Sequence, residues 1–224
     1  MNAPQINTGN QFQQVLHISQ LLPLPSDTPF GNFALKYLKI VDRIDRVNSL
    51  ILDVFSSFLL AHQSQGLGED LFRHQLIAEE VVYWLRKSAD ELISLQYVLC
   101  IQEKTGQFPT KIEVDCIGLL NHRNAHDFKQ NFLDHLSILN ILNEVSNAYK
   151  HSFVNSEISS IGTEEPYVFA LALKRNDLGN KHKFHSVRFA ELVTGFDSFF
   201  QDSVEMLRKC KLPHQSPNKS VGAN

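Results

Sequence analysis

The sequence predicts a mainly α-helical fold, an antiparallel up-and-down helical bundle with one β-hairpin at about residues 167–189 and a C-terminal helix. Apolar residues recur at helical spacing through the first two thirds of the chain, which is the pattern of amphipathic helices. Two β-leaning runs then flank a loop of asparagine, aspartate and glycine, which is typical of a hairpin. Short connections between the helices favour antiparallel packing.

Two long helices are expected first. Over residues 33–60 apolar positions alternate at spacings of three and four, which predicts a helix with one buried face. Gly66 and Gly68 end it, because glycine disfavours a helical backbone. A second helix is expected over residues 69–103, with acidic residues in its first turn, at the positive end of the helix dipole. Gly106 follows it in the position of a helix stop.

A third continuous helix is expected over residues 127–153, after a short apolar stretch at 112–120 that is either a helical turn or irregular. The runs YVFALALKR and KFHSVRF form the predicted hairpin around NDLGNK. An amphipathic helix over residues 190–209 closes the bundle. Because phenylalanine prefers burial, the phenylalanines of this helix and of the preceding strand are assigned to the core rather than to an interface: Phe184, Phe189, Phe196, Phe199 and Phe200.

The composition fits one globular domain. The chain has 224 residues, of which 43% are hydrophobic and 20% charged, as in ordinary soluble domains. We expect a single helical domain with its hairpin over residues 31–210, a flexible or extended segment at 1–30 and a disordered tail at 211–224. The LLPLP sequence at 21–25 either packs in extended form on the body or remains a loose tail, which we prefer.

Charge, cysteines and motifs exclude several classes of function. A net charge of −3 argues against a dedicated duplex-DNA binder. No signal peptide or membrane span is evident, and the three cysteines are far apart, so we expect a cytoplasmic protein with reduced thiols and no membrane contact. The glycines form neither a GxGxxG motif nor a P-loop, and HExxH is absent. We therefore expect no cofactor.

The ten histidines raise the question of a metal site. His122 and His126 lie one helical turn apart, and His135 follows. A convincing site needs three or four ligands, so our interpretation is a capped or solvated helix start without a metal, with a metal site through these three histidines as the alternative. His74 stands four residues after Asp70, which predicts a surface ion pair.

The stretch SILNILNEVSNAYKHSF, residues 137–153, carries the most functional information. Helical spacings of four, three and four place four polar residues in one stripe, with Asn143 beside it: Asn140, Glu144, Asn147 and His151. Asparagine is a poor helix former, because its amide competes for backbone groups. The stripe is therefore either a buried hydrogen-bond network that fixes helix or dimer register, which we prefer, or a ligand or catalytic site with Glu144 or His151 as proton acceptor.

The segment NAYKHSF resembles the HEPN helical domains of prokaryotic toxin–antitoxin and defence systems. Their motif is an arginine, usually followed by a polar residue such as asparagine, and then a histidine a few residues beyond. Asn147 and His151 match its second part. The resemblance implies a dimer that brings two motifs together in a cleft, and active members cleave RNA. Ser146 stands in the position of the arginine, so the resemblance implies a non-cleaving member.

We therefore expect a non-catalytic interaction or scaffold protein that forms a homodimer, with the polar stripe at or near the interface, and that can also bind a protein partner. The alternative is a metal-independent ribonuclease in which His151 is the general acid or base, Lys150 contacts phosphate and Asn147 positions the substrate. RNA is a partner only under this alternative. A metal-binding helical bundle is the second alternative.

Overall fold

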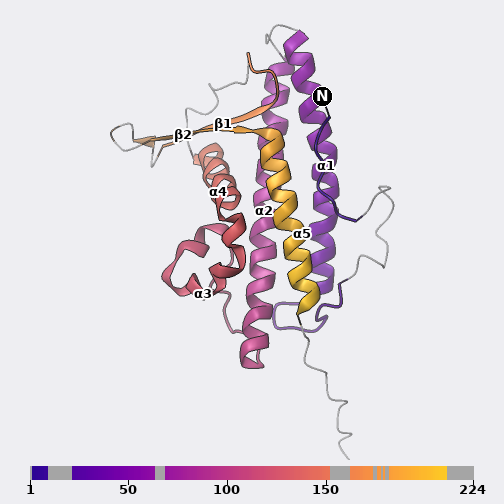
Figure 1. Ribbon diagram of the computed structural model, residues 1–224, viewed down its shortest axis with the longest axis vertical. Coiled ribbons are helices and arrows are strands. Elements are labelled where there is room, and N and C mark those ends of the chain that lie inside the picture. The colour runs from indigo at the N-terminus through magenta and orange to yellow at the C-terminus, as the bar shows by residue number, and fades with distance from the viewer. Residues whose placement is uncertain are drawn as a thin grey trace, which may run out of the picture.

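Four long helices run alternately up and down the described part of the chain (Figure 1). They are α1 (Phe33–Gln63), α2 (Glu69–Thr105), α4 (Leu136–His151) and α5 (Phe189–Lys209). The computed structural model describes residues 2–9, 22–63, 69–151, 162–173, 176, 177, 179 and 182–210, so the predicted tail at 211–224 lies outside them. This arrangement confirms the predicted mainly helical bundle with a hairpin before its last helix.

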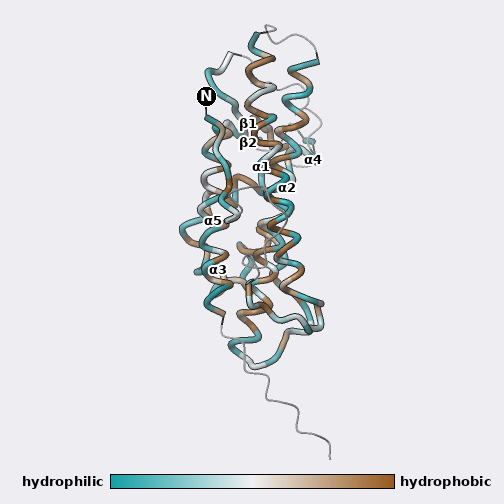
Figure 2. The backbone as a smooth tube through the Cα atoms, turned by 90° about the vertical axis from the view of Figure 1, so that its right-hand side faces the viewer, coloured by the Kyte–Doolittle hydropathy of each residue, from teal (hydrophilic) through white to brown (hydrophobic). Residues whose placement is uncertain are grey.

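The first two helices pack against each other and agree with the predicted ranges. Asn32 begins α1, because its side-chain oxygen accepts the backbone N–H of Leu35 at 2.9 Å. The apolar positions of α1, among them Ile44 and Ile51, are buried. A stretch of α2 contacts its neighbours on nearly all sides, since most residues over 92–99 are buried. Hydrophobic and hydrophilic positions alternate along the helices, as Figure 2 shows.

The prediction of one continuous helix over residues 127–153 is wrong. The chain instead forms a four-residue helix, α3 (His126–Lys129), a 3₁₀ segment, η4 (Gln130–His135), and then α4. Two more 3₁₀ turns precede them, η2 (Ile117–Asn121) and η3 (Arg123–Ala125). A 3₁₀ turn is tighter than an α-helix, and here it accompanies an aromatic cluster. The Phe128 ring lies 5.3 Å from Tyr97 and 5.1 Å from Phe132.

The hairpin consists of β1 (Tyr167–Ala172) and β2 (Lys183–Arg188), paired antiparallel with Tyr167 opposite Arg188. Val168, Ala170 and His185 are buried, and the strands contact α4 and α5. The other face carries a ladder of stacked rings, because Phe169 lies 5.6 Å from Tyr167 and 5.9 Å from Phe184. The helices therefore provide the support that an isolated two-stranded hairpin lacks.

The described N-terminal residues 2–9 run in extended form along α1 and α5. The Asn48 side chain accepts the backbone N–H of Ile6 and donates to its carbonyl oxygen, both at 2.8 Å. On the α5 side, Gln201 donates to the carbonyl oxygen of Asn7 at 2.6 Å. Ile6 is buried in the core. Leu22 and Leu24 are buried too, so the LLPLP region packs on the body, and the preferred loose tail is wrong there.

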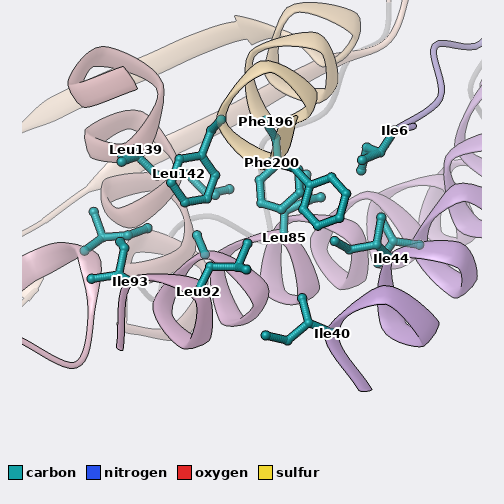
Figure 3. Close-up of a cluster of buried hydrophobic side chains, with 14 of the residues drawn as sticks. Ile6, Ile40, Ile44, Leu85, Leu92, Ile93, Leu139, Leu142, Phe196 and Phe200 are labelled. Atoms are coloured by element: carbon teal, nitrogen blue, oxygen red, sulfur yellow. The ribbon is translucent and has the colours of Figure 1, made fainter. Parts of the chain in front are cut away.

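One hydrophobic core runs through the bundle and includes side chains from the helices and from Ile6 (Figure 3). Four of the phenylalanines that we assigned to the core are fully buried there: Phe189, Phe196, Phe199 and Phe200. The assignment of Phe184 to the core is wrong, because this residue of the hairpin is 54% exposed. Among the described residues, no helix is both long enough and apolar enough to cross a membrane.

Gly195 allows α5 to approach α4 closely. A Cβ atom at this position would lie 2.8 Å from Cγ1 and 3.3 Å from Cβ of Ile138 on α4. Such distances are shorter than ordinary van der Waals contacts. The glycine therefore sets the separation of the two helices at this crossing.

We expect Gly195→Ala to destabilise the protein by about 1–2 kcal/mol, because overpacking outweighs the gain in helix propensity of about 1 kcal/mol. In an Ile138→Ala background the same change is expected to be neutral or stabilising, since most of the colliding atoms are gone. Urea unfolding followed by circular dichroism measures both effects. Equal effects in the two backgrounds would contradict the close approach.

Candidate functional site

The polar stripe lies on α4, which contacts both α2 and β1. The apolar side of α4 is buried through Leu139, Leu142 and Val145. The predicted site residues of α4 divide into two groups by exposure. Four are half-buried: Asn140, Asn143, Glu144 and Asn147. Two at the end of the helix are exposed: Lys150 and His151. The stripe is therefore neither a closed core network nor a single cleft.

Glu144 points to the hairpin. Its carboxylate accepts a hydrogen bond from Nζ of Lys183 at 2.5 Å, and Nε2 of the buried His185 lies 3.3 Å away without hydrogen-bond geometry. Burial lowers the pKa of His185, an effect that Glu144 opposes and Lys183 reinforces. His185 is thus held mainly neutral, and Glu144 attaches α4 to β2 rather than facing a free substrate.

Asn147 points to α2. Nη1 of Arg86 donates to its side-chain oxygen at 3.1 Å, and its own amide donates to Asn143 at 3.4 Å. Nε of Arg86 lies 3.5 Å from a carboxylate oxygen of Asp90. Arg86 is not among the site residues predicted from the sequence. Its i,i+4 spacing from Asp90 was the one available signal, and that spacing says nothing about a contact with Asn147, 61 residues away.

Asp90 is the acidic group at this junction. Its carboxylate accepts the backbone N–H of Ile117 at 2.8 Å. Burial raises its pKa, while that hydrogen bond and the charges of Arg86, Lys87 and Lys150 oppose the shift. Asp90 therefore faces three cations here, one of which, Lys87, also pairs with Glu91 at 3.2 Å. We call Arg86, Lys87 and Lys150 the basic cluster.

Lys150 completes the basic cluster from α4. Its Nζ lies 4.9 Å from the centre of the Tyr83 ring, within the range of a cation–π interaction. Burial lowers the pKa of Lys150; Arg86 and Lys87 add to this effect, and Asp90 opposes it. Clustered like charges of this kind are a place where an anionic group binds favourably.

The residues that carry the HEPN resemblance are not arranged as a linear motif. Ser146 is buried, and its hydroxyl has no hydrogen-bond partner in the described structure. His151 is exposed at the last residue of α4. A guanidinium does lie beside Asn147, but it belongs to Arg86 of α2. Lys150 lies next to His151 in the chain, so the basic cluster and the histidine are neighbours.

Asn140, the first residue of the stripe, faces a third element. Its side-chain oxygen accepts a hydrogen bond from Asn121 at 3.2 Å. Asn121 in turn accepts one from Nζ of Lys129 at 2.8 Å. These bonds attach the start of α4 to the 3₁₀ region, so Asn140 belongs to a local polar network apart from Arg86.

The three candidate metal ligands are not brought together. His122 and His126 are exposed, whereas His135 is buried and its Nε2 lies 2.7 Å from a carboxylate oxygen of Asp202 on α5. Within the described ranges, no group of three or more histidine, cysteine or acidic side chains has the arrangement of a metal site. The predicted surface ion pair of His74 is also wrong, because this ring is buried.

The outer face of α2 carries a second feature that the sequence analysis missed. Phe72, Leu76 and Tyr83 are 61%, 50% and 40% exposed. We call these three residues the α2 stripe. Their spacings of four and seven place them along one line of the helix, as in a coiled-coil seam. Tyr83 joins the stripe to the basic cluster, since it contacts Lys150.

Comparisons of the chain with protein-family models, with curated proteins and with solved structures found no match. The candidate functional surface is therefore defined by geometry alone. It comprises the α2 stripe, the basic cluster and the adjoining end of α4.

The burial of His74 makes stability depend on pH. Nδ1 lies 3.1 Å from the Val54 carbonyl oxygen and 3.2 Å from the Ser57 hydroxyl. Burial lowers the pKa of His74, against the effect of the Val54 hydrogen bond. Below about pH 6.5 the unfolded chain binds a proton that the folded chain resists, so stability falls with falling pH.

We therefore expect the free energy of unfolding to decrease between about pH 7.5 and about pH 5.5, with a shallower slope in His74→Leu. Urea titrations across this range measure the slope. His122→Leu is the matched control, since His122 is exposed. A slope in His74→Leu as steep as that of the wild type would show that His74 does not titrate in this way.

Proposed function

We propose that this protein is a non-catalytic interaction protein that forms a homodimer, with the α2 stripe of one subunit packed on the α2 stripe of the other. Exposed apolar residues in a continuous line are typical of protein interaction sites. The coiled-coil spacing of Phe72, Leu76 and Tyr83 favours another helix as the occupant. The end of α4 borders this surface through the contact of Lys150 with Tyr83.

The charge pattern around Tyr83 is the observation that carries the choice of a second copy. Glu79 and Glu80 stand four and three residues before Tyr83, and Arg86 and Lys87 stand three and four residues after it. A two-fold interface must be self-complementary, because each residue i that meets j is matched by a j that meets i. In an antiparallel pair of α2 helices, acidic residues before Tyr83 and cations after it satisfy this condition.

The same pattern assigns partners across the two-fold axis. Residues seven apart lie on the same side of a helix, so Glu79 faces Arg86 of the partner subunit. On the other side, Glu80 faces Lys87 of the partner subunit. Tyr83 packs near the axis, between these ion pairs. Burial raises the pKa of Glu79, and an opposing cation in the dimer would lower it again.

We expect a dimer at micromolar concentration in analytical ultracentrifugation. Lys87→Glu places like charges opposite each other twice and is expected to weaken the dimer by about tenfold. Glu80→Lys is expected to do the same. The double variant Glu80→Lys/Lys87→Glu restores the pairs with reversed sign, so its dissociation constant is expected to return toward that of the wild type.

Leu76→Asp is expected to give a monomer, because it puts a charge in the centre of the apolar line. Leu35→Asp is the matched control, since Leu35 is equally large and 54% exposed on α1. A monomeric wild type, or a double variant no better than the single variants, would contradict the proposed dimer.

A metal-independent ribonuclease is the second candidate, and the contact of Arg86 with Asn147 favours it. It provides a guanidinium where Ser146 cannot, and such a cation stabilises the charge that develops on a phosphate. Under this hypothesis His151 is the general acid or base, Lys150 contacts the phosphate and Asn147 positions the phosphate. Glu144 is engaged with Lys183 and is not at this position.

If the protein is a ribonuclease, His151→Ala and Arg86→Gln are each expected to lower RNA cleavage by at least about a hundredfold. A single-stranded RNA cleavage assay in the presence of EDTA measures this effect without metal-dependent contaminants. His122→Ala is the control for a second exposed histidine. Equal cleavage by the wild type and the His151 variant rejects the ribonuclease and leaves the interaction protein.

A further inference from the structure

A cavity of about 340 Å³ opens between the N-terminal half of α1 and the C-terminal half of α2. This volume lies at the lower end of the range of small-molecule pockets, roughly 300–1,000 Å³. It shares no residue with the α2 stripe or the basic cluster. Six apolar side chains form its inner wall: Phe30, Phe33, Ile40, Leu95, Val98 and Ile112.

The rim of the cavity carries an excess of positive charge. Lys36, Lys39 and Arg43 line it from one face of α1, against the single carboxylate of Glu91. Both Glu91 oxygens accept hydrogen bonds from Arg43, at 2.8 and 3.3 Å, and Nζ of Lys87 lies 3.2 Å away. The negative charge of Glu91 is thus already balanced by Arg43 and Lys87. In the described part of the chain, neither Lys36 nor Lys39 forms an ion pair.

These two observations define the chemistry of a ligand. Two neighbouring lysines without counter-charges repel each other and attract an anion. The part of the apolar wall that is not yet buried, at Phe30 and Ile112, gains free energy only when it is covered by an apolar group. A bare inorganic anion leaves this part hydrated, and a neutral hydrocarbon leaves the lysines without a partner. The volume admits a small molecule and excludes a polymer.

We propose that this cavity binds an amphiphilic carboxylate, with the alkyl body against the half-buried Phe30 and Ile112 and the carboxylate between Lys36 and Lys39. The Ser94 hydroxyl takes no part, because it donates to the carbonyl oxygens of Asp90 and Asp115. The proposal does not require the homodimer.

Isothermal titration calorimetry of the full chain with decanoate, at low ionic strength, tests the site. We expect saturable binding of one decanoate per chain, and weaker binding of decanol, which has the same chain length without the charge. Lys36→Gln/Lys39→Gln is expected to weaken decanoate binding by about tenfold. Both lysines are exposed, so the variant is expected to fold.

Glu91→Gln is expected to have the opposite effect on decanoate binding. It removes the one negative charge of the rim, so decanoate is expected to bind severalfold more tightly. Lys104→Gln is the matched control, because Lys104 is exposed on α2 outside the cavity. Circular dichroism establishes that each variant is folded. Three results would overturn the proposal: no saturable binding, equal affinity for decanol, or unchanged affinity in the folded double lysine variant.

Discussion

The burial of α2 against three other helices is the constraint on which the rest of the structure depends. It contacts α1, α4 and α5, and over residues 92–99 nearly every side chain is in the core. A helix enclosed in this way tolerates few changes of side-chain volume. In the N-terminal part of α2, one side of the helix faces away from the bundle's interior, and the α2 stripe is exposed on that side. The candidate surfaces therefore border one helix, because the three other long helices pack on it.

Polar contacts fix the orientation of the neighbouring elements relative to α2 and α4. Arg86 connects α2 to Asn147, and Glu144 connects α4 to Lys183 of the hairpin. Each such bond between partly exposed groups contributes about 1 kcal/mol or less, far below the contribution of the shared core. Their effect is on rotation and register: turning α4 about its axis would break bonds to several neighbours at once. The mid-helix asparagines therefore have a structural use, although one different from a closed network.

Periodicity predicted the helices but could not predict what their polar faces meet. The ranges 33–60 and 69–103 were near the observed ones because one buried stripe repeats along each helix. The break before α4 left no such signal, since 3₁₀ and α-helical turns bury nearly the same positions. Asn48 binds the backbone of Ile6, 42 residues away, and no spacing rule relates the two. The same holds for Arg86 and its partner Asn147, which are 61 residues apart.

Glu91 connects the cavity to the proposed dimer face. Burial raises the pKa of its carboxyl, but the hydrogen bonds and charges of Arg43 and Lys87 outweigh this, so the pKa lies below its usual value and the group is ionised at neutral pH. If both proposals hold, a carboxylate bound between Lys36 and Lys39 would compete with Glu91 for the neighbouring Arg43. Glu91 would then interact more strongly with Lys87 and weaken the proposed ion pair of Lys87 with Glu80 of the partner subunit. Because linkage is reciprocal, ligand binding and dimerisation would oppose each other through this carboxylate, by no more than an exposed ion pair is worth, about 1 kcal/mol.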